Sequence, residues 1–336
     1  MENFYFIGID VSKKKLDYCL LFKGEVLKED ITTNHPAAIR GYLSSLYKEF
    51  GLSNEKVIIC AEHTGQYTYP LVCACECEKC KLWLENPTQI KYCSGMQREK
   101  NDKIDAKRIA IYASRYMDNV KVYQRPTQEL ERLNQLNSEL KMLVADKAKY
   151  QGQLTDQKDF MSAQLYKAKR KRLTTLIKGL KEAIDAIERD MTDIVANSKA
   201  LSHQMKLLKN VEGVGPKVAM MMIIETGAFS NYENHRKFCC HAGVAPFRYT
   251  SGSSQRSRNK VSKKADKSIK TLLHLAAMSV IRKKESELKD YYIRKVEEGK
   301  NKMTVINAMR AKLVARMFAV IKNDQDYTIN HPISLA

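Results

Sequence analysis

The sequence predicts an α/β domain followed by a mostly helical remainder, because three regions differ in pattern. Short apolar runs alternate with helical segments over residues 1–118. Residues 128–200 contain no proline and repeat leucine and isoleucine at heptad spacing, which indicates a coiled coil. From Leu207 onward glycine and proline return between helical segments. We therefore expect three domains, over residues 1–118, 128–200 and 204–330.

Short apolar runs predict the N-terminal strands, and two of these runs end in an acid. FYFIGID ends at Asp10, and VIICAE ends at Glu62. A turn at Lys23 and Gly24 joins two further runs into a meander. The expected elements are strands over 4–10, 15–22, 25–32 and 57–62, a strand at KLWLEN, helices over 35–50 and 101–116, and one helix after Glu62.

The central region carries an apolar seam. Leu173, Leu180, Ile187 and Ile194 recur every seven residues, and other apolar residues fall between them at the complementary position. This is the a/d pattern of a coiled coil over about three heptads. The leucines between residues 130 and 143 form either an antiparallel partner within the chain or a dimer seam.

The C-terminal region begins with a Gly-Val-Gly-Pro turn that opens a helix. Pro216 suits the first helical position, and the N–H groups of such a helix start can bind phosphate. Further helices are expected over residues 232–242, 268–284 and 303–323.

The composition favours a polyanionic partner. The formal net charge is +20 over 336 residues, and an excess of this size favours nucleic acid. No apolar run approaches the roughly 18 residues that span a bilayer, and the start MENFYFIGID lacks the features of a signal peptide. We expect no membrane association and a cytoplasmic location at the nucleoid.

The nine cysteines are expected to be free thiols, because their number is odd and no secretion signal accompanies them. Four stand in CACECEKC, which raises the alternative of a zinc site. On a helix Cys73, Cys77 and Cys80 share one face, and Cys75 points away. No second ligand pair stands at zinc-finger spacing, so we favour packing in the core.

Four carboxylates stand where they can converge. Asp10 and Glu62 end strands, and Asp102 and Asp105 lie three apart on one helix face. Acids at the carboxyl ends of neighbouring strands meet in one crevice, and clustered oxygen ligands select Mg²⁺ or Mn²⁺. Taken singly, each acid is instead a turn cap or a solvated side chain. Their order along the strands and helix matches a ribonuclease-H-like nuclease core, of the kind found in Holliday junction resolvases.

Five segments carry a resemblance to a known family. They are IGIDVSKKKLD, AEHTGQY, KNDKIDAKRIA, NVEGVGPKVA and HAGVAPFRYTSGSSQRSRNKVSK. Over nearly its whole length the chain resembles the DEDD insertion-sequence transposases. These are relatives of Piv-type DNA invertases and act as bridge-RNA-guided recombinases. The resemblance implies a RuvC-like N-terminal domain, a coiled-coil insert and a C-terminal transposase domain. It also implies a Mg²⁺-dependent enzyme whose metal ligands are Asp10, Glu62, Asp102 and Asp105.

The resemblance further implies a serine nucleophile, Ser251, in the SG pair of the last segment. Its hydroxyl would attack a DNA phosphate and form a covalent serine–DNA intermediate. In similar proteins the carboxylates of one subunit meet the serine of another. From the sequence alone Ser253 and Ser254 are rival nucleophiles. His241 is a candidate base for a serine–histidine mechanism, although a histidine at a helix end is more often structural.

The segment around Ser251 is basic and contains no carboxylate. Arginine and lysine can hold DNA phosphates beside a reactive hydroxyl. The expected nucleic-acid-binding residues are Arg248, Arg256, Arg258, Lys260, Lys263 and Lys264. Similar proteins carry glycine where this chain has Ala265, so the turn after the serine segment is expected to differ.

The resemblance implies donor and target DNA as substrates and a non-coding bridge RNA that selects the target by base pairing. It also implies homodimers that pair into a tetramer on DNA. Two other functions fit the residues. In a Mg²⁺-dependent junction-resolving nuclease, water attacks and Ser251 only contacts phosphate. A non-catalytic coiled-coil protein that binds nucleic acid would tolerate Asp10→Asn.

Overall fold

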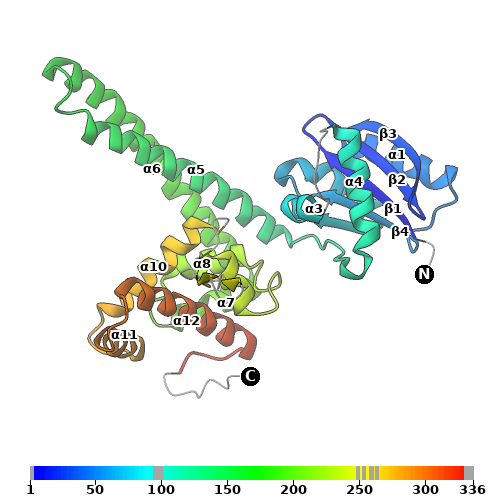
Figure 1. Ribbon diagram of the computed structural model, residues 1–336. Helices are drawn as coiled ribbons and strands as arrows, with labels where there is room; N and C mark the ends of the chain where they lie inside the picture. The colour runs from blue at the N-terminus through cyan, green and yellow to red at the C-terminus, as the bar shows by residue number, and fades with distance from the viewer. Residues whose placement is uncertain are drawn as a thin grey trace. The chain divides into compact units, whose positions relative to one another are not determined.

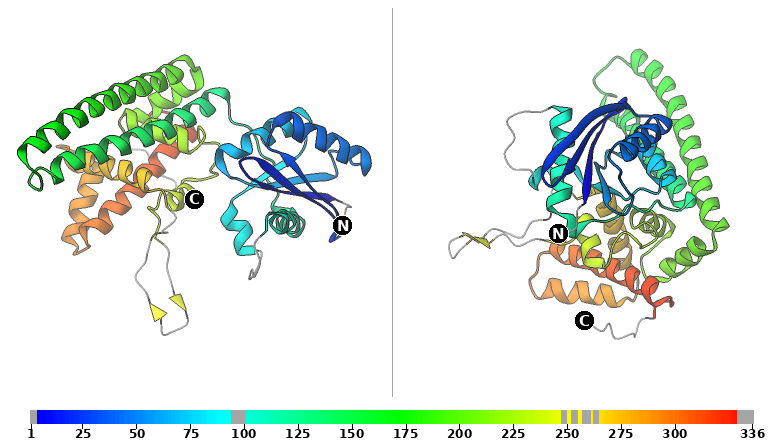
Figure 2. Two further views of the ribbon diagram at one scale, coloured as in Figure 1. Left: turned by 90° about the horizontal axis from the view of Figure 1, so that it is seen from above. Right: turned by 90° about the vertical axis from the view of Figure 1, so that its right-hand side faces the viewer.

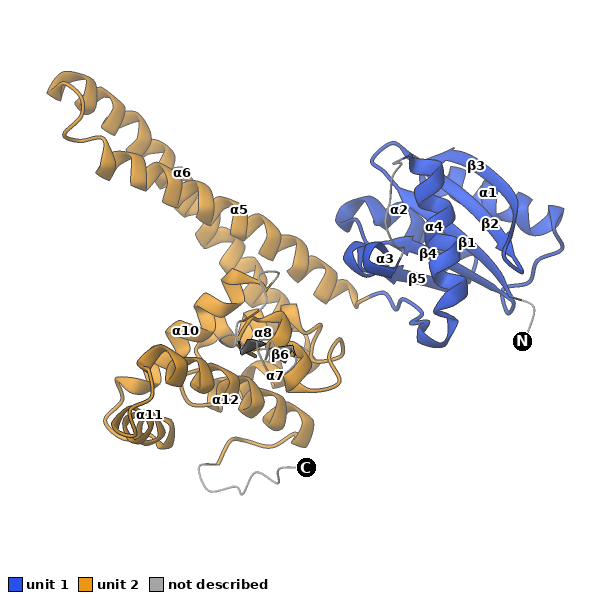
Figure 3. Ribbon diagram, viewed as in Figure 1, with its two compact units in different colours: residues 1–125 blue, residues 126–336 orange. Residues whose placement is uncertain are grey.

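The chain forms two compact units, residues 1–125 and 126–336 (Figure 3). The computed structural model describes residues 4–93, 101–246, 250–251, 255–256, 261 and 265–328. Each unit has a hydrophobic core of its own. The helices of the region 128–200 belong to the second unit, and their separation as a domain stays a prediction.

The first unit contains a five-stranded sheet (Figure 1). Its strands are β1 (Tyr5–Val11), β2 (Lys15–Phe22), β3 (Glu25–Thr33), β4 (Val57–Glu62) and β5 (Leu82–Glu85), in the order β3-β2-β1-β4-β5. The first three form an antiparallel meander. β4 pairs parallel with β1, and β5 with β4. The predicted α/β, ribonuclease-H-like arrangement of the N-terminal region is confirmed.

Helices cover both faces of this sheet (Figure 1). They are α1 (Pro36–Glu49), α2 (Tyr69–Cys77), α3 (Pro87–Cys93) and α4 (Asp102–Arg115), with short 3₁₀ turns η1 (Gly65–Thr68) and η2 (Met117–Asn119). Side chains alternate between the faces of a strand. Ile7 and Ile9 of β1 therefore pack with Leu43 of α1, whereas Phe6 packs with Ile109 of α4.

Helix α4 lies directly on the backbone of β1, because Gly8 has no side chain. A Cβ atom at Gly8 would lie 2.2 Å from the carbonyl oxygen of Ala106 and 2.3 Å from the nitrogen of Ala110. Asn101 caps the start of the helix, because its side chain accepts a hydrogen bond from the N–H of Lys103. This close approach sets the position of the acidic first turn of α4.

The cysteines of α2 lie differently from the predicted faces. Cys75 is buried and Cys77 is exposed, while Cys73 and Cys80 are half-buried. The prediction that Cys75 points away was wrong, because α2 packs through the side that carries Leu71, one turn before Cys75. All nine cysteines are free thiols, as predicted. No cysteine belongs to a metal-binding group among the residues that the structure describes.

The second unit begins with a long helical hairpin. Helices α5 (Gln128–Asp156) and α6 (Ala163–Asn197) run side by side (Figure 2). The predicted seam residues of α6 face inward: Ile187 is buried, and Leu173, Leu180 and Ile194 are half-buried. The leucines of α5 find their partner in the same chain, which confirms the interpretation as an antiparallel partner.

The remaining elements form a helical bundle with a small hairpin. They are α7 (Lys199–Asn210), α8 (Pro216–Glu225), α9 (His235–His241), β6 (Thr250–Ser251), β7 (Gln255–Arg256), α10 (Lys267–Ile281), α11 (Glu287–Glu297) and α12 (Lys302–Asn323). Leu208, Met222, Phe238, Leu273 and Leu313 are fully buried in one core. The mostly helical C-terminal region is confirmed, although α7 and α11 were not predicted. Within the described part of the chain, no helix has the length and apolarity to cross a membrane.

Candidate metal-binding active site

Acidic residues form a row across four adjacent strands of the first unit. Asp10 on β1 lies directly opposite Asp17 on β2. The parallel register of β1 and β4, continued by one residue, places Glu62 beside Asp10. Glu62 pairs in turn with Glu85 on β5. Because cross-strand partners share a face of the sheet, these four acids lie on the face that α4 covers.

The first turn of α4 adds Asp102 and Asp105 to this row. Single carboxylate oxygens of Asp10, Asp17 and Asp102 all lie within 4.8 Å of one another. Glu62 and Asp105 are close enough for their charges to act on Asp10. The structure therefore groups Asp10 and Asp102 with Asp17 at metal-binding distance, and it places Glu62 and Asp105 near Asp10 but outside that group.

Burial and repulsion raise the pKa of Asp10 to about 6. Desolvation is the largest cause, followed by the negative charges of Glu62, Asp102, Asp105 and Asp17. Both effects disfavour the ionised carboxylate. A cation bound between these oxygens would reverse the repulsion, so the site is electrostatically prepared for a positive charge.

One lysine already supplies positive charge to the cluster. The Nζ atom of Lys15 lies 2.8 Å from Oδ2 of Asp102 and 3.0 Å from Oδ2 of Asp17. These carboxylates raise the pKa of Lys15, chiefly through hydrogen bonds to Asp102 and Asp17. Asp105 makes a separate ion pair with Arg108, at 2.8 Å on the same helix.

Two acids of the row, Asp17 and Glu85, were missed from the sequence. Asp17 is 1% exposed, and Lys15 is the positive side chain that it contacts. Glu85 accepts hydrogen bonds from the Tyr112 hydroxyl at 3.0 Å and from the N–H of Asn86 at 2.7 Å. The signal for Asp17 was present, since counting residues across the turn between β1 and β2 pairs it with Asp10.

The donor set of the cluster fits a divalent metal ion. It offers only carboxylate oxygens, which are the ligands that Mg²⁺ and Mn²⁺ prefer. Asp10 and Asp17 come from rigid neighbouring strands, whereas Asp102 is half exposed. A site with one solvent-facing side leaves room for water and a substrate phosphate in the coordination shell.

The predicted nucleophile belongs to the second unit. Ser251 on β6 pairs with Gln255 on β7, and Thr250 pairs with Arg256. The side chains of Ser251 and Arg256 lie outside the described residues. So do the whole residues Arg248, Ser253, Ser254, Arg258, Lys260, Lys263 and Lys264. The approach of Ser251 to the acids stays a prediction.

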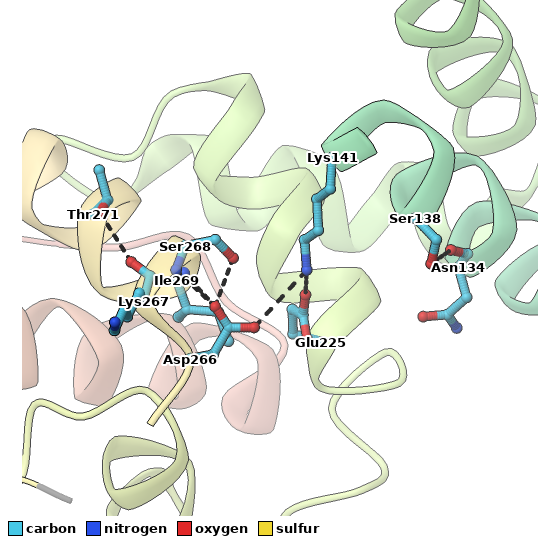
Figure 4. A network of polar contacts seen from close by, with 9 residues as sticks. All are labelled: Asn134, Ser138, Lys141, Glu225, Asp266, Lys267, Ser268, Ile269 and Thr271. Atoms are coloured by element: carbon cyan, nitrogen blue, oxygen red, sulfur yellow. Dashed lines mark hydrogen bonds and ion pairs between the residues drawn. The ribbon is translucent and has the colours of Figure 1, made fainter. Parts of the chain in front are cut away.

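Asp266, which follows the basic segment around Ser251 (residues 249–264, called the serine segment) in the sequence, is held by several polar contacts. Asp266 caps α10 by accepting hydrogen bonds from the N–H groups of Ser268 at 2.7 Å and Ile269 at 3.2 Å (Figure 4). Lys141 of α5 bridges Asp266 at 3.9 Å and Glu225 of α8 at 2.8 Å (Figure 4). The start of α10 is therefore tied to α5 and α8.

Ala265, which stands where similar proteins carry glycine, packs tightly on Gly243. A Cβ atom at Gly243, whose φ is +65°, would lie 2.5 Å from Cβ of Ala265. The N–H of Asp266 donates to the carbonyl oxygen of His241 at 3.1 Å. The His241 side chain is exposed and lies beside the ring of Tyr232, which fits a structural role.

Comparisons with known proteins bear on both units. Solved structures of Thermus thermophilus RuvC resemble the chain locally. The structure in complex with a Holliday junction substrate is 13% identical, has a TM-score of 0.28, and covers 36% of this chain and 99% of its own. A second RuvC structure is 14% identical, with a TM-score of 0.27, over 35% of this chain and 99% of its own.

Full-length relatives and family models give the stronger match. The pilin gene-inverting proteins of Moraxella bovis and Moraxella lacunata are each 23% identical over 96% of this chain and 97% of their own. The model described as DEDD transposase of IS110 type matches residues 7–161. The model described as transposase of the IS116/IS110/IS902 family matches residues 205–293. The two matches together span well over half of the chain, which belongs to the IS110-type transposase family.

Proposed function

We propose that this transposase cuts and rejoins DNA at a divalent metal centre held by Asp10, Glu62, Asp102 and Asp105. The observation that carries the proposal is the convergence of acids from three strands and the first turn of α4. Such a cluster is unfavourable without a cation. DNA inversion, for which the pilin gene-inverting relatives from Moraxella are named, is a reaction of the same kind.

Mg²⁺ is the metal that we expect, with Mn²⁺ as a substitute. When bound, it would stabilise the charge on the attacking and leaving oxygens of phosphoryl transfer. The residues of the chain hold the metal and leave one side open for the DNA. Asp10 and Glu62 hold fixed positions because buried strands carry them. Asp102 stands at the exposed side of the cluster, where a DNA phosphate would enter.

We assign the nucleophile to Ser251. Its oxygen would bond to a DNA phosphorus while the phosphorus–oxygen bond of the cut strand breaks, so that serine is esterified. Attack by the hydroxyl of a second strand would release serine and rejoin the DNA. A serine hydroxyl needs a base, and the segment around Ser251 has no carboxylate. The base would therefore come from the acidic cluster.

The net charge of the chain and the placement of the acids and Ser251 in different units support the proposed nucleic-acid partners and subunit arrangement. A net charge of +20 favours donor and target DNA and a non-coding bridge RNA. The six basic residues of the serine segment would hold phosphates. Acids and serine lie in different units, which allows them to come from different subunits of a dimer or tetramer on DNA.

One observation favours a second function, a hydrolytic nuclease. The acids and their sheet lie wholly within the first unit. Such a cluster can activate water without any serine. In that enzyme Ser251 would serve only as a phosphate contact, and the products would be cut strands that are not rejoined.

Strand cleavage and rejoining test the proposal. The substrate is DNA that spans the gene of this chain and its flanks, supplied with RNA transcribed from those flanks. We expect products with the wild type in Mg²⁺, and at least a hundredfold less with Asp10→Asn. Glu55→Gln removes an exposed acid of the same unit and should keep wild-type activity. Equal activity of Asp10→Asn and Glu55→Gln would contradict the proposed site.

A further inference from the structure

We propose that Lys15 is a built-in counter-cation that occupies the acidic cluster when metal is absent and leaves when metal binds. The inference rests on the proposed metal centre. It assigns a role to a residue outside the four expected ligands. The starting observation is that the Lys15 ammonium bridges two acids of the cluster, Asp17 and Asp102.

The fold holds the base of Lys15 in place. Ser12 Oγ donates to the carbonyl oxygen of Lys15 at 2.8 Å and accepts from its N–H at 3.3 Å. Lys15 and Asp17 are two residues apart on β2, so they lie on the same face of the sheet. The side chain of Lys15 therefore starts beside the acids, whatever its outer end does.

Asp17 explains why a cation is needed there. Its carboxylate is 2% exposed and stands directly opposite Asp10 across the two strands. Like charges at such positions destabilise a sheet, and a buried carboxylate without a partner is costly. Apart from the Lys15 contact, neither oxygen of Asp17 has a hydrogen-bond partner among the residues that the structure describes. The ammonium thus supports the metal-free fold.

The outer end of Lys15 is free to leave. The side chains of Lys15 and Asp102 are 41% and 49% exposed, and ion pairs at this exposure are weak. A divalent ion carries twice the charge of an ammonium and binds several oxygens at once. Metal would therefore displace Lys15 from Asp102, and the long side chain would turn into solvent.

Competition of this kind makes a prediction about affinity. If Lys15 holds the place of the metal, its removal strengthens metal binding. We expect Lys15→Met to bind Mn²⁺ about tenfold more tightly than the full-length wild type. We expect Lys15→Arg to stay within about threefold of the wild type, because the charge remains. Without metal, Lys15→Met should melt a few degrees lower, since Asp17 loses its partner.

The test is titration of the full-length protein with Mn²⁺. Binding is measured by calorimetry and by the electron spin resonance signal of free Mn²⁺. Lys14→Met is the matched control, because Lys14 is an exposed neighbour and carries the same charge. Lys15→Gln serves if Lys15→Met does not fold. Tighter binding by Lys15→Met or Lys15→Gln than by Lys14→Met supports the inference. Equal or weaker binding overturns it.

The two proposals fail in different ways. If the lysine variants all bind Mn²⁺ as the wild type does and Asp10→Asn abolishes binding, the metal centre stands and the proposed role of Lys15 is wrong. If Asp10→Asn binds as well as the wild type, the metal centre itself falls. A lower melting temperature that also appears in Lys14→Met would show a general charge effect, and it would remove the proposed support of the metal-free fold by Lys15.

Discussion

At the scale of residues, the acids of the site trade stability for function. Asp10 is partly buried among like charges, and its pKa rises to about 6. An unfolded aspartate titrates near pH 4. Between these values the folded protein binds more protons than the unfolded chain, so the free energy of unfolding falls as the pH rises. The loss is complete about one pH unit above this pKa, near pH 7.

Replacement of Asp10 by asparagine should therefore stabilise the metal-free protein. At pH 8 we expect the free energy of unfolding to rise by about 1 kcal/mol, after allowance for solvent screening. The gain should shrink as the pH falls below 6 and should vanish below about pH 4, where the aspartate is neutral in both states. Urea unfolding at pH 8 and pH 4.5 checks this. A loss of stability at pH 8, or a gain that Glu55→Gln shares, would contradict it.

The pH dependence of metal binding follows from the same residue. A metal ion needs the ionised carboxylate, so affinity should rise as the pH increases through about 6. Titration of the wild type with Mn²⁺ between pH 5 and pH 8 measures this. Affinity that is constant over the whole range would show that Asp10 is not a ligand.

At the scale of elements, the approach of α4 to β1 fixes the site. Gly8 lets the helix lie on the strand, and the acidic first turn of α4 then reaches Asp10. In the second unit, the ion pairs around Asp266 position α10, because they connect it to α5 and α8. Gly8 thus sets the position of α4, and Asp266 sets the position of α10.

Gly8→Ala should push α4 away from the sheet. A methyl group there meets backbone atoms, which cannot rotate aside, so we expect a loss of about 1–3 kcal/mol of stability and weaker metal binding. Among the described residues, no atom lies within 4 Å of a Cβ added at Gly41 of α1, and Gly41→Ala should be neutral or stabilising. Thermal melts with and without Mn²⁺ compare the two. Equal behaviour would show that the close packing is not needed.

The sequence predicted the site best where an acidic residue stands at the end of an apolar strand. Asp10 and Glu62 were found because a polar residue ends an apolar strand. Asp17 was missed because its face depends on pairing with β1, and burial inside a strand hides it among apolar neighbours. The face of Cys75 was wrong because helical periodicity alone does not tell which side meets the core. Helix α11 was missed because it is short and mostly polar.

At the scale of the whole molecule, charge governs the encounter with DNA. A net charge of +20 predicts binding that weakens steeply with salt, through release of counterions. Replacing Arg256, Arg258 and Lys260 by glutamine should reduce the salt slope by about three, near 0.9 for each lost phosphate contact. Fluorescence anisotropy with labelled DNA at several salt concentrations measures the slope.

The matched control removes three exposed lysines of the first unit, Lys48, Lys56 and Lys79. Lys48 lies on α1, Lys56 directly precedes β4, and Lys79 follows α2, so none of them belongs to the acidic cluster. This variant should keep most of the wild-type slope. If the salt slope falls by the same amount in both triple variants, DNA binding depends on net charge alone, and the serine segment is not a specific DNA contact.

The covalent step is the central claim, and a denaturing gel tests it most directly. Purified protein is incubated with labelled donor and target DNA, Mg²⁺ and RNA transcribed from the flanks of its gene. Ser251→Ala and Ser253→Ala run beside the wild type. We predict a protein–DNA band that survives denaturation, requires Mg²⁺ and disappears only in Ser251→Ala. Strand cleavage without this band, unchanged in Ser251→Ala, would contradict the account and show a nuclease that uses water.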